Sequence, residues 1–126
     1  MKRFLGMLLL LCLLAALPGC TAEGLEDMQW IEGEDGPSIV RGDSAYVFYG
    51  FVGGDRLTGR QIGVLDGDGD HKVFAVKGYA DADWVLERLD TLMSGTTCSL
   101  FRRADLADIP EDFALDEESM FLHNYA

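Results

Sequence analysis

The sequence is poor in basic residues, has only two histidines and holds three cysteines. Ten Lys and Arg face 22 Asp and Glu in 126 residues, which gives a formal charge of −12. Such a surface repels the phosphates of nucleic acids and of anionic lipids, so we expect neither as a partner. The length is enough for one modest domain and too short for two comfortable ones.

Apolar runs long enough to span a bilayer are also missing. Lys2 and Arg3 precede an apolar run over residues 4–17, whereas a membrane-spanning helix needs about 20 residues. A basic start followed by a short apolar run is typical of a secretory signal. We therefore expect residues 1–19 to be read by the export machinery and removed.

The apolar run ends in Leu17-Pro18-Gly19-Cys20, the most specific motif of the chain. It resembles the lipobox of bacterial lipoproteins, although Pro18 replaces the Ala, Ser or Thr that is usual there. The resemblance implies that the Cys20 thiol receives a diacylglyceryl group, that cleavage precedes Cys20, and that the new amino terminus is often acylated. Two or three acyl chains give lasting attachment. The implied location is the extracytoplasmic face of the cell membrane or of an outer membrane.

The mature chain lacks the cysteines for a disulfide framework. Cys12 leaves with the signal and Cys20 carries lipid in this interpretation, so Cys98 has no partner in its own chain. Cys98 lies in an apolar, β-prone run over residues 96–101, and we interpret it as a buried core thiol. A reactive thiol and an intermolecular disulfide are the alternatives. The domain must then be held together by packing alone, in an oxidising compartment.

The composition divides the mature chain into three parts. Without Lys2 and Arg3, eight basic residues face 22 acidic ones, a formal charge of −14. We expect residues 20–37, rich in Glu, Asp and Gly, to form a lipidated acidic tether. Residues 38–110 then form a small domain. Residues 111–126 form an acidic tail with enough apolar side chains to pack on that domain, and residues 116–122 predict a short helix in it.

The patterning of the domain predicts an α+β fold. Residues 44–52 are dense in aromatic and β-branched side chains, which favours a buried strand. Two apolar runs over residues 61–76 flank Asp-Gly and predict a β-hairpin. Residues 82–93 have apolar side chains at helical spacing behind Asp81 as N-cap, so we expect one helix packed on a small antiparallel sheet. A last strand is predicted over residues 97–102.

A second resemblance covers about half of the mature chain. The stretches QIGVLDGD, KVFAVKGYADADWVLERLD and IPEDF are similar to short extracytoplasmic bacterial proteins of uncharacterised activity, in which a β-hairpin leads to Lys-Gly-Tyr and a Trp-containing helix. The resemblance implies one compact domain and no particular chemistry.

The hairpin turn carries three aspartates at alternate positions. Asp66, Asp68 and Asp70 match the first, third and fifth ligands of calcium loops such as the EF-hand. The rest of the match fails, because His71 stands where the sharp turn needs glycine and Lys77 stands where a glutamate closes the shell. The intervening glycines suit a plain solvated turn. We prefer that interpretation to a weak calcium site.

Motifs for nucleophilic or zinc-dependent catalysis are missing from the sequence. We expect an ordinary exposed or partly packed role for His71 and His123, no cofactor and no enzyme activity. The open face of the sheet, or the helix that carries Trp84, would meet another envelope protein. The sequence therefore predicts a lipid-anchored interaction or scaffold module. A lipoprotein that binds a small ligand, or calcium through the aspartate loop, is the alternative.

Overall fold

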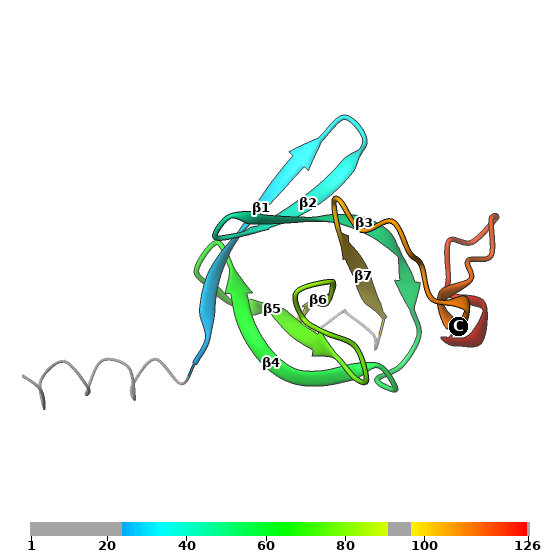
Figure 1. Ribbon diagram of the computed structural model, residues 1–126. Helices are drawn as coiled ribbons and strands as arrows, with labels where there is room; N and C mark the ends of the chain where they lie inside the picture. The colour runs from blue at the N-terminus through cyan, green and yellow to red at the C-terminus, as the bar shows by residue number, and fades with distance from the viewer. Residues whose placement is uncertain (1–23, 91–96, 126) are drawn as a thin grey trace, which may run out of the picture.

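Strands form almost all of the regular structure in the computed structural model, which describes residues 24–90 and 97–125. They close into a barrel in the order β1-β2-β3-β7-β6-β5-β4, and β1 completes it by pairing in parallel with β4 (Figure 1). The strands are β1 (Glu26–Gly33), β2 (Gly36–Arg41), β3 (Ser44–Val52), β4 (Thr58–Leu65), β5 (Asp68–Val76), β6 (Trp84–Leu89) and β7 (Cys98–Arg103). In the described ranges, no helix is long and apolar enough to cross a membrane.

The strands expected from the sequence are confirmed. β3 covers residues 44–52 as predicted, and β4 and β5 form the predicted antiparallel hairpin around Asp66 and Gly67. β7 starts and ends one residue later than expected. Asp66 has a φ of 53° and Gly67 a φ of 71°, so this turn needs the residue types that tolerate a left-handed backbone.

The predicted α+β fold is wrong, because the segment expected to form the packed helix over residues 82–93 is a strand in its described part. Residues 81–83 form a turn, and β6 then pairs with β5 on one side and β7 on the other. Four consecutive residues, 84–87, are buried. A strand that is buried on both faces has a continuous apolar run, and such a run does not differ in pattern from part of a buried helix. Residues 91–93 lie outside the described residues.

The barrel interior contains one cluster of buried side chains. Every strand contributes at least one member, which only the inside of a closed barrel allows. The members are Met28, Ile39, Tyr46, Ile62, Leu65, Val73, Val85 and Phe101. Because side chains alternate along a strand, the neighbours of these residues face outward.

A second buried cluster lies on the outer face of β3, β5, β6 and β7. It includes Trp84 and Leu86 of β6, which flank the inward-facing Val85. Two further members, Phe113 and Leu122, come from the C-terminal segment and are 0% exposed. The outer cluster therefore exists only because the C-terminal segment covers it.

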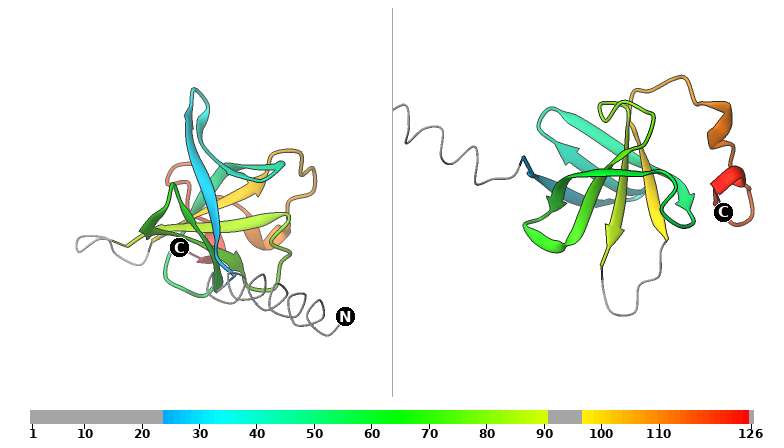
Figure 2. Two further views of the ribbon diagram at one scale, coloured as in Figure 1. Left: turned by 90° about the vertical axis from the view of Figure 1, so that its left-hand side faces the viewer. Right: turned by 90° about the horizontal axis from the view of Figure 1, so that it is seen from below.

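The C-terminal segment, residues 104–125, lies beside the end of β3 (Figures 1 and 2) and contains the 3-10 helices η1 (Glu111–Phe113) and η2 (His123–Tyr125). β2 pairs with β3 only as far as Val47, which leaves the later part of that edge open. There the Phe51 amide donates to the Met120 carbonyl at 2.8 Å, and the Leu122 amide donates to the Phe51 carbonyl at 2.9 Å. The short helix predicted over residues 116–122 is wrong, since residues 117–119 form a turn and Met120 has a φ of 62°.

The start of the described chain belongs to the barrel and not to a tether. β1 begins at Glu26, Met28 is 0% exposed in the interior cluster, and Trp30 packs against that cluster. Residues 26–37, which the sequence analysis assigned to the acidic tether, thus form β1 and the start of β2. The predicted signal over residues 1–19 and the lipidation site Cys20 lie outside the described residues.

Candidate functional site

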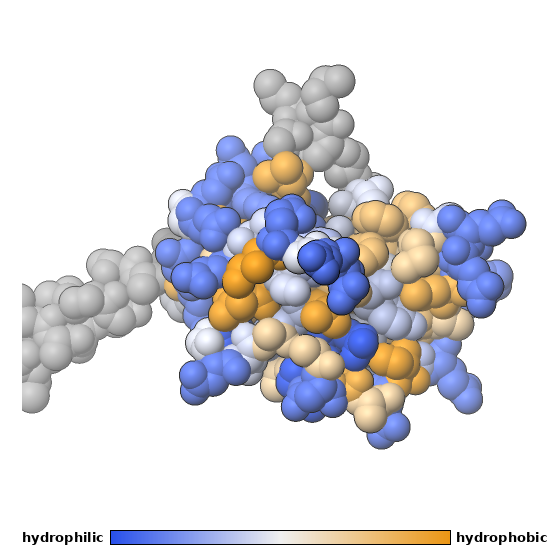
Figure 3. All heavy atoms as spheres, turned by 90° about the horizontal axis from the view of Figure 1, so that it is seen from above, coloured by the Kyte–Doolittle hydropathy of each residue, from blue (hydrophilic) through white to orange (hydrophobic). Residues whose placement is uncertain are grey.

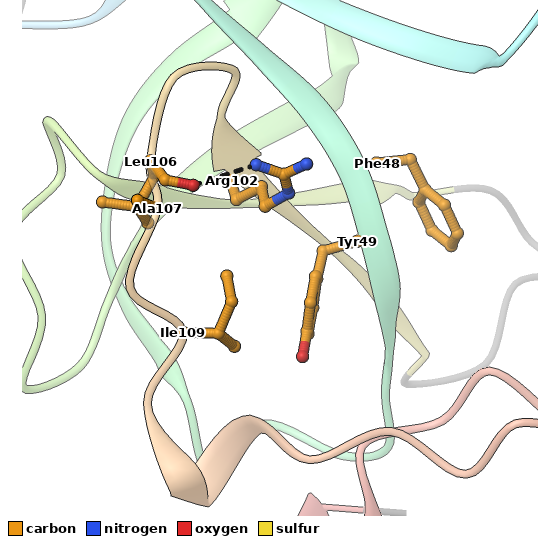
Figure 4. Close-up of a pocket in the computed structure, with 6 residues that line it drawn as sticks. All are labelled: Phe48, Tyr49, Arg102, Leu106, Ala107 and Ile109. Carbon is orange, nitrogen blue, oxygen red and sulfur yellow. Dashed lines mark hydrogen bonds between the residues drawn. The ribbon is translucent and has the colours of Figure 1, made fainter.

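A hollow of about 430 Å³ lies between the outer face of β3 and β7 and the loop that follows β7 (Figure 4). Its lining residues are Phe48, Tyr49, Arg102, Leu106, Ala107 and Ile109. We call it the Arg102 groove. Figure 4 shows the Arg102 guanidinium and the Tyr49 ring facing this space, with Ile109 across from Tyr49 and the Phe48 side chain on the far side of β3.

A β-bulge places Tyr49 in the groove. The register between β3 and β7 shifts between Phe48 and Gly50, so Tyr49 is the extra residue and turns to the outer face. Its hydroxyl donates to the Phe113 carbonyl at 2.6 Å, and its ring meets Trp84 edge to face at 5.2 Å. Burial raises the pKa of Tyr49, and the charge of Arg102 opposes that shift in part. Tyr49 is thus a neutral wall of the groove with its hydrogen already donated.

Arg102 differs from the other half-buried arginines of the described residues, Arg41, Arg88 and Arg103, each of which makes an ion pair. Arg41 binds Glu26 at 2.6 Å and Arg88 binds Asp90 at 2.6 Å. Arg102 is half-buried, and one of its terminal nitrogens donates to the Leu106 carbonyl at 3.1 Å, but it makes no ion pair with any acid in the part of the chain that the structure describes. A guanidinium has five donors in a planar fork. Its remaining donors are therefore available to a carboxylate from outside.

The opposite wall of the groove is apolar. Ile109 is 38% exposed, Leu106 is half-buried and packs against the outer cluster, and the exposed Ala107 lies between them. A guanidinium beside exposed aliphatic groups binds an anion that also carries an apolar group. The six lining residues include no Ser, Cys, His, Lys, Asp or Glu, and the charged and polar groups that they offer are the Arg102 guanidinium and the Tyr49 hydroxyl.

The aspartate loop fastens β1 to the hairpin. The Trp30 amide donates to the Asp66 carboxylate at 3.2 Å, and the Gly67 amide donates to the Asp27 carboxylate at 2.9 Å. The Asp68 carboxylate accepts the amide of Asp70 at 2.9 Å. Within the described residues, no group of three His, Cys, Asp or Glu is placed to hold a metal ion. The hydrogen bonds of Asp66 and Asp68 therefore stabilise the turn and hold it against β1.

Trp84 is not available as the predicted interaction residue. It is 2% exposed and lies in the outer cluster, between the rings of Tyr49 and Phe113. The prediction placed it on a helix that would meet a partner, whereas β6 places it between Tyr49 and Phe113 in the outer cluster. Trp84 supports the groove from behind through Tyr49.

Cys98 is buried, as predicted, with 1% exposure. Burial raises the pKa of its thiol, and the neighbouring Thr58 hydroxyl opposes the shift in part. A buried thiol with a raised pKa is a poor nucleophile. His123 is exposed, as expected.

His71 is half-buried, and its Nε2 lies 2.6 Å from a carboxylate oxygen of Glu87, the one charged residue that is buried among those described. The Trp30 ring lies 5.1 Å from the His71 ring and 5.7 Å from Phe101. The pair thus lies at the edge of the interior cluster, where Trp30 of β1 lies beside His71 of β5. Each member satisfies a polar atom of the other, so we assign the pair a structural role.

Sequence reasoning missed the Arg102 groove, although one signal was present. Cys98 and Leu100 face the outer cluster, and Arg102 is the next residue of that face in β7. Arg102 is thus a charged residue at a position where the alternation of β7 predicts an apolar one. Such a departure from the local pattern often marks a functional residue. No family model, no curated protein and no solved structure matches this chain.

Proposed function

We propose that this chain is a lipid-anchored lipoprotein of the bacterial cell envelope, whose barrel is a small acidic interaction module that binds a partner protein through the Arg102 groove. The anchor rests on Leu17-Pro18-Gly19-Cys20. The observation that carries the binding role is Arg102 itself, a half-buried guanidinium with no carboxylate partner among the described residues of an acid-rich chain.

The short distance between Cys20 and the barrel favours a partner close to the membrane. β1 begins at Glu26, six residues after Cys20. An extended chain spans at most about 3.5 Å per residue, so a lipid on Cys20 holds the start of β1 within about 20 Å of the lipid surface. A protein of the same membrane, or one that lies against it, is within reach of such a barrel.

The remaining surface supports a local contact more than a broad apolar interface. On the face that Figure 3 shows, hydrophobic residues form small patches separated by hydrophilic ones. Among residues 24–90 and 97–125, the exposed large hydrophobic residues are Ile31, Leu89, Ile109 and Met120, which come from four different parts of the chain. Of these, Ile109 lines the groove. An interface built there has an apolar centre and acidic surroundings.

Mass spectrometry of the full chain expressed in a bacterium tests the anchor. We expect cleavage before Cys20 and a diacylglyceryl mass on that residue. The Cys20→Ser variant is the control and should keep its leader and lack the added mass. An unmodified Cys20 thiol in the wild-type protein would contradict the anchor, whatever the groove binds.

Site-specific photocrosslinking in intact cells tests the binding role. A photoreactive residue at the exposed Ala107 should give a discrete adduct, and the same residue at Asp35, on the β1–β2 turn, should not. The adduct should disappear when Arg102→Gln is added and persist when the exposed Arg60 is changed to Gln. An adduct that is insensitive to Arg102→Gln would remove the groove from the proposal.

A further inference from the structure

We infer that the Arg102 groove recognises the free carboxyl terminus of a polypeptide whose last side chain is apolar. This inference rests on the proposed binding role of the groove and names the chemistry that the partner must present.

The donors of Arg102 fit one carboxylate. One terminal nitrogen donates to the Leu106 carbonyl at 3.1 Å, which fixes the plane of the guanidinium against the loop after β7. The remaining nitrogens are free donors at the end of the groove, and Figure 4 shows the guanidinium above Tyr49 and Ile109. An arginine fork and a carboxylate form two parallel charge-assisted hydrogen bonds, and such pairs are shorter and stronger than neutral ones.

The charges near the groove favour a ligand with a single negative charge. Asp105 and Asp108 are exposed on the loop that carries Leu106 and Ile109, and the mature chain has a formal charge of −14. Phosphorylated or poly-acidic segments would bring further negative charge against these residues. Screening beyond about 8 Å at physiological salt leaves the short contact with Arg102 effective. A lone terminal carboxylate meets both conditions.

The size and the wall of the groove favour the end of a chain over a whole small molecule. About 430 Å³ is at the small end of ligand sites, which span roughly 300–1,000 Å³. The exposed side of Ile109 and the Tyr49 ring offer an apolar contact for one side chain next to the carboxylate. The hollow is open to solvent, so the rest of a longer chain leaves without obstruction.

The pairing of β3 excludes the common alternative, in which a peptide adds a strand to a sheet edge. One edge of β3 pairs with β7 from Tyr46 to Val52, with the bulge at Tyr49. The other edge pairs with β2 as far as Val47 and with the C-terminal segment at Phe51. The groove lies between these contacts on the face of the sheet, so a ligand reaches Arg102 with its end and not with an extended backbone.

Isothermal titration of the barrel, residues 21–126 with a free amino terminus and its fold checked by thermal unfolding, tests the inference. The probes are N-acetyl-Ala-Leu with a free carboxylate and its carboxamide, which differ only in the charge that Arg102 would bind. We expect the acid to bind about tenfold more tightly than the amide. Arg102→Gln should abolish that difference, and Arg60→Gln should preserve it.

Two further probes define what would overturn the inference. N-acetyl-Ala-Asp should bind more weakly than N-acetyl-Ala-Leu, and Ile109→Asp, a change at an exposed position, should weaken N-acetyl-Ala-Leu without lowering the melting temperature. Equal binding of acid and amide, preference for the acidic peptide, or no binding of either probe at millimolar concentration would each overturn carboxyl-terminus recognition. If crosslinking at Ala107 still depends on Arg102 in that case, the binding role stands and the ligand is of another kind.

Discussion

The two buried clusters of this molecule are built in different ways. The interior cluster takes at least one side chain from each of the seven strands, and hydrogen-bonded neighbours hold every contributor. The outer cluster takes its sheet side from β3, β5, β6 and β7, but its cover comes from Leu57 and from a C-terminal segment with little regular structure. The interior is enclosed by the fold itself, and the outer cluster is enclosed by one attached segment.

The candidate site lies at the boundary between the sheet and the segment that covers the outer cluster. The loop after β7 leaves the sheet to begin the cover, and the groove lies where that loop and β3 do not quite meet. Segments that cover a sheet without pairing along their length are a recurring place for binding sites, because their packing leaves hollows.

Removing the largest cover residue should have the largest effect and should separate the clusters. Phe113 is 0% exposed and its ring meets Tyr79, Trp84 and Tyr125. We expect Phe113→Ala to cost about 3–5 kcal/mol in the free energy of unfolding. Phe101→Ala in the interior, also 0% exposed, should cost a similar amount.

The two alanine variants should nevertheless differ in hydrogen exchange. In Phe113→Ala, faster exchange should centre on the amides of the C-terminal segment and of Phe51, while β1 and β2 keep their protection. In Phe101→Ala, all seven strands should exchange faster. Equal acceleration over the whole chain in both variants would show that the two clusters unfold as one unit.

A smaller effect is expected at the contact between β3 and the cover. A Cβ on Gly50 would lie 2.3 Å from the Leu115 side chain and 2.9 Å from the Met120 carbonyl. The side chain can move, but the carbonyl belongs to the backbone that pairs with Phe51. Gly50→Ala should therefore cost about 1–3 kcal/mol, as overpacked substitutions do, measured by denaturant unfolding.

Gly69 supplies the matched control for this substitution. A Cβ there meets nothing within 4 Å, and its φ is not in the left-handed region. Gly69→Ala should leave stability nearly unchanged. If both alanine variants are equally stable, the cover is not seated against Gly50 as described.

The hydrogen bond between β1 and the β4–β5 hairpin should contribute less to stability. Asp27→Ala removes the carboxylate that accepts the Gly67 amide at 2.9 Å, at an exposed position. We expect a loss of about 0.5–1.5 kcal/mol, as for a typical hydrogen bond, with faster exchange confined to the seam between β1 and β4. Asp35→Ala at the exposed β1–β2 turn is the control, because it also removes one negative charge. An equal loss of stability there would mean that the change in net charge, and not the Asp27–Gly67 hydrogen bond, is responsible.

The smallest effect concerns pH. Hydrogen bonds from Arg88, and then from Lys72, hold the pKa of Asp90 below its ordinary value of 3.8. Because the folded pKa is the lower one, this stabilisation is complete above the ordinary value and is lost as the pH falls through the lowered pKa. Asp90→Asn should lower the melting temperature slightly at pH 6, and the difference from wild type should vanish in strong acid. A difference that grows towards acid pH would reverse the assigned sign.

The strands that sequence reasoning found are those with one clear signal. β3 is rich in aromatic and β-branched side chains, and the Asp-Gly turn defined the hairpin. β6 was mistaken for a helix because interior and outer clusters bury both of its faces, which erases alternation. The acidic composition around Trp30 concealed β1, in which only Met28 is buried and Trp30 is half-buried among mostly polar and acidic neighbours.

The candidate site was less predictable than the strands. The groove depends on where the loop after β7 runs and on the bulge at Tyr49, and neither follows from local propensity. The aspartate loop has the spacing of a calcium loop, but the Asp66 and Asp68 carboxylates accept backbone amides of β1 and of the hairpin. Single sequences show which residues are polar and not which of them remain unpaired after folding.

The buried residues Phe113 and Leu122 make the outer cluster depend on the carboxyl-terminal part of the chain. Synthesis runs from the amino end, so Phe113 and Leu122 are the last buried members of the outer cluster to be made. A chain that stops or is cut before residue 113 would leave the apolar outer faces of β5, β6 and β7 exposed to water. We expect proteases and quality control to remove such a chain.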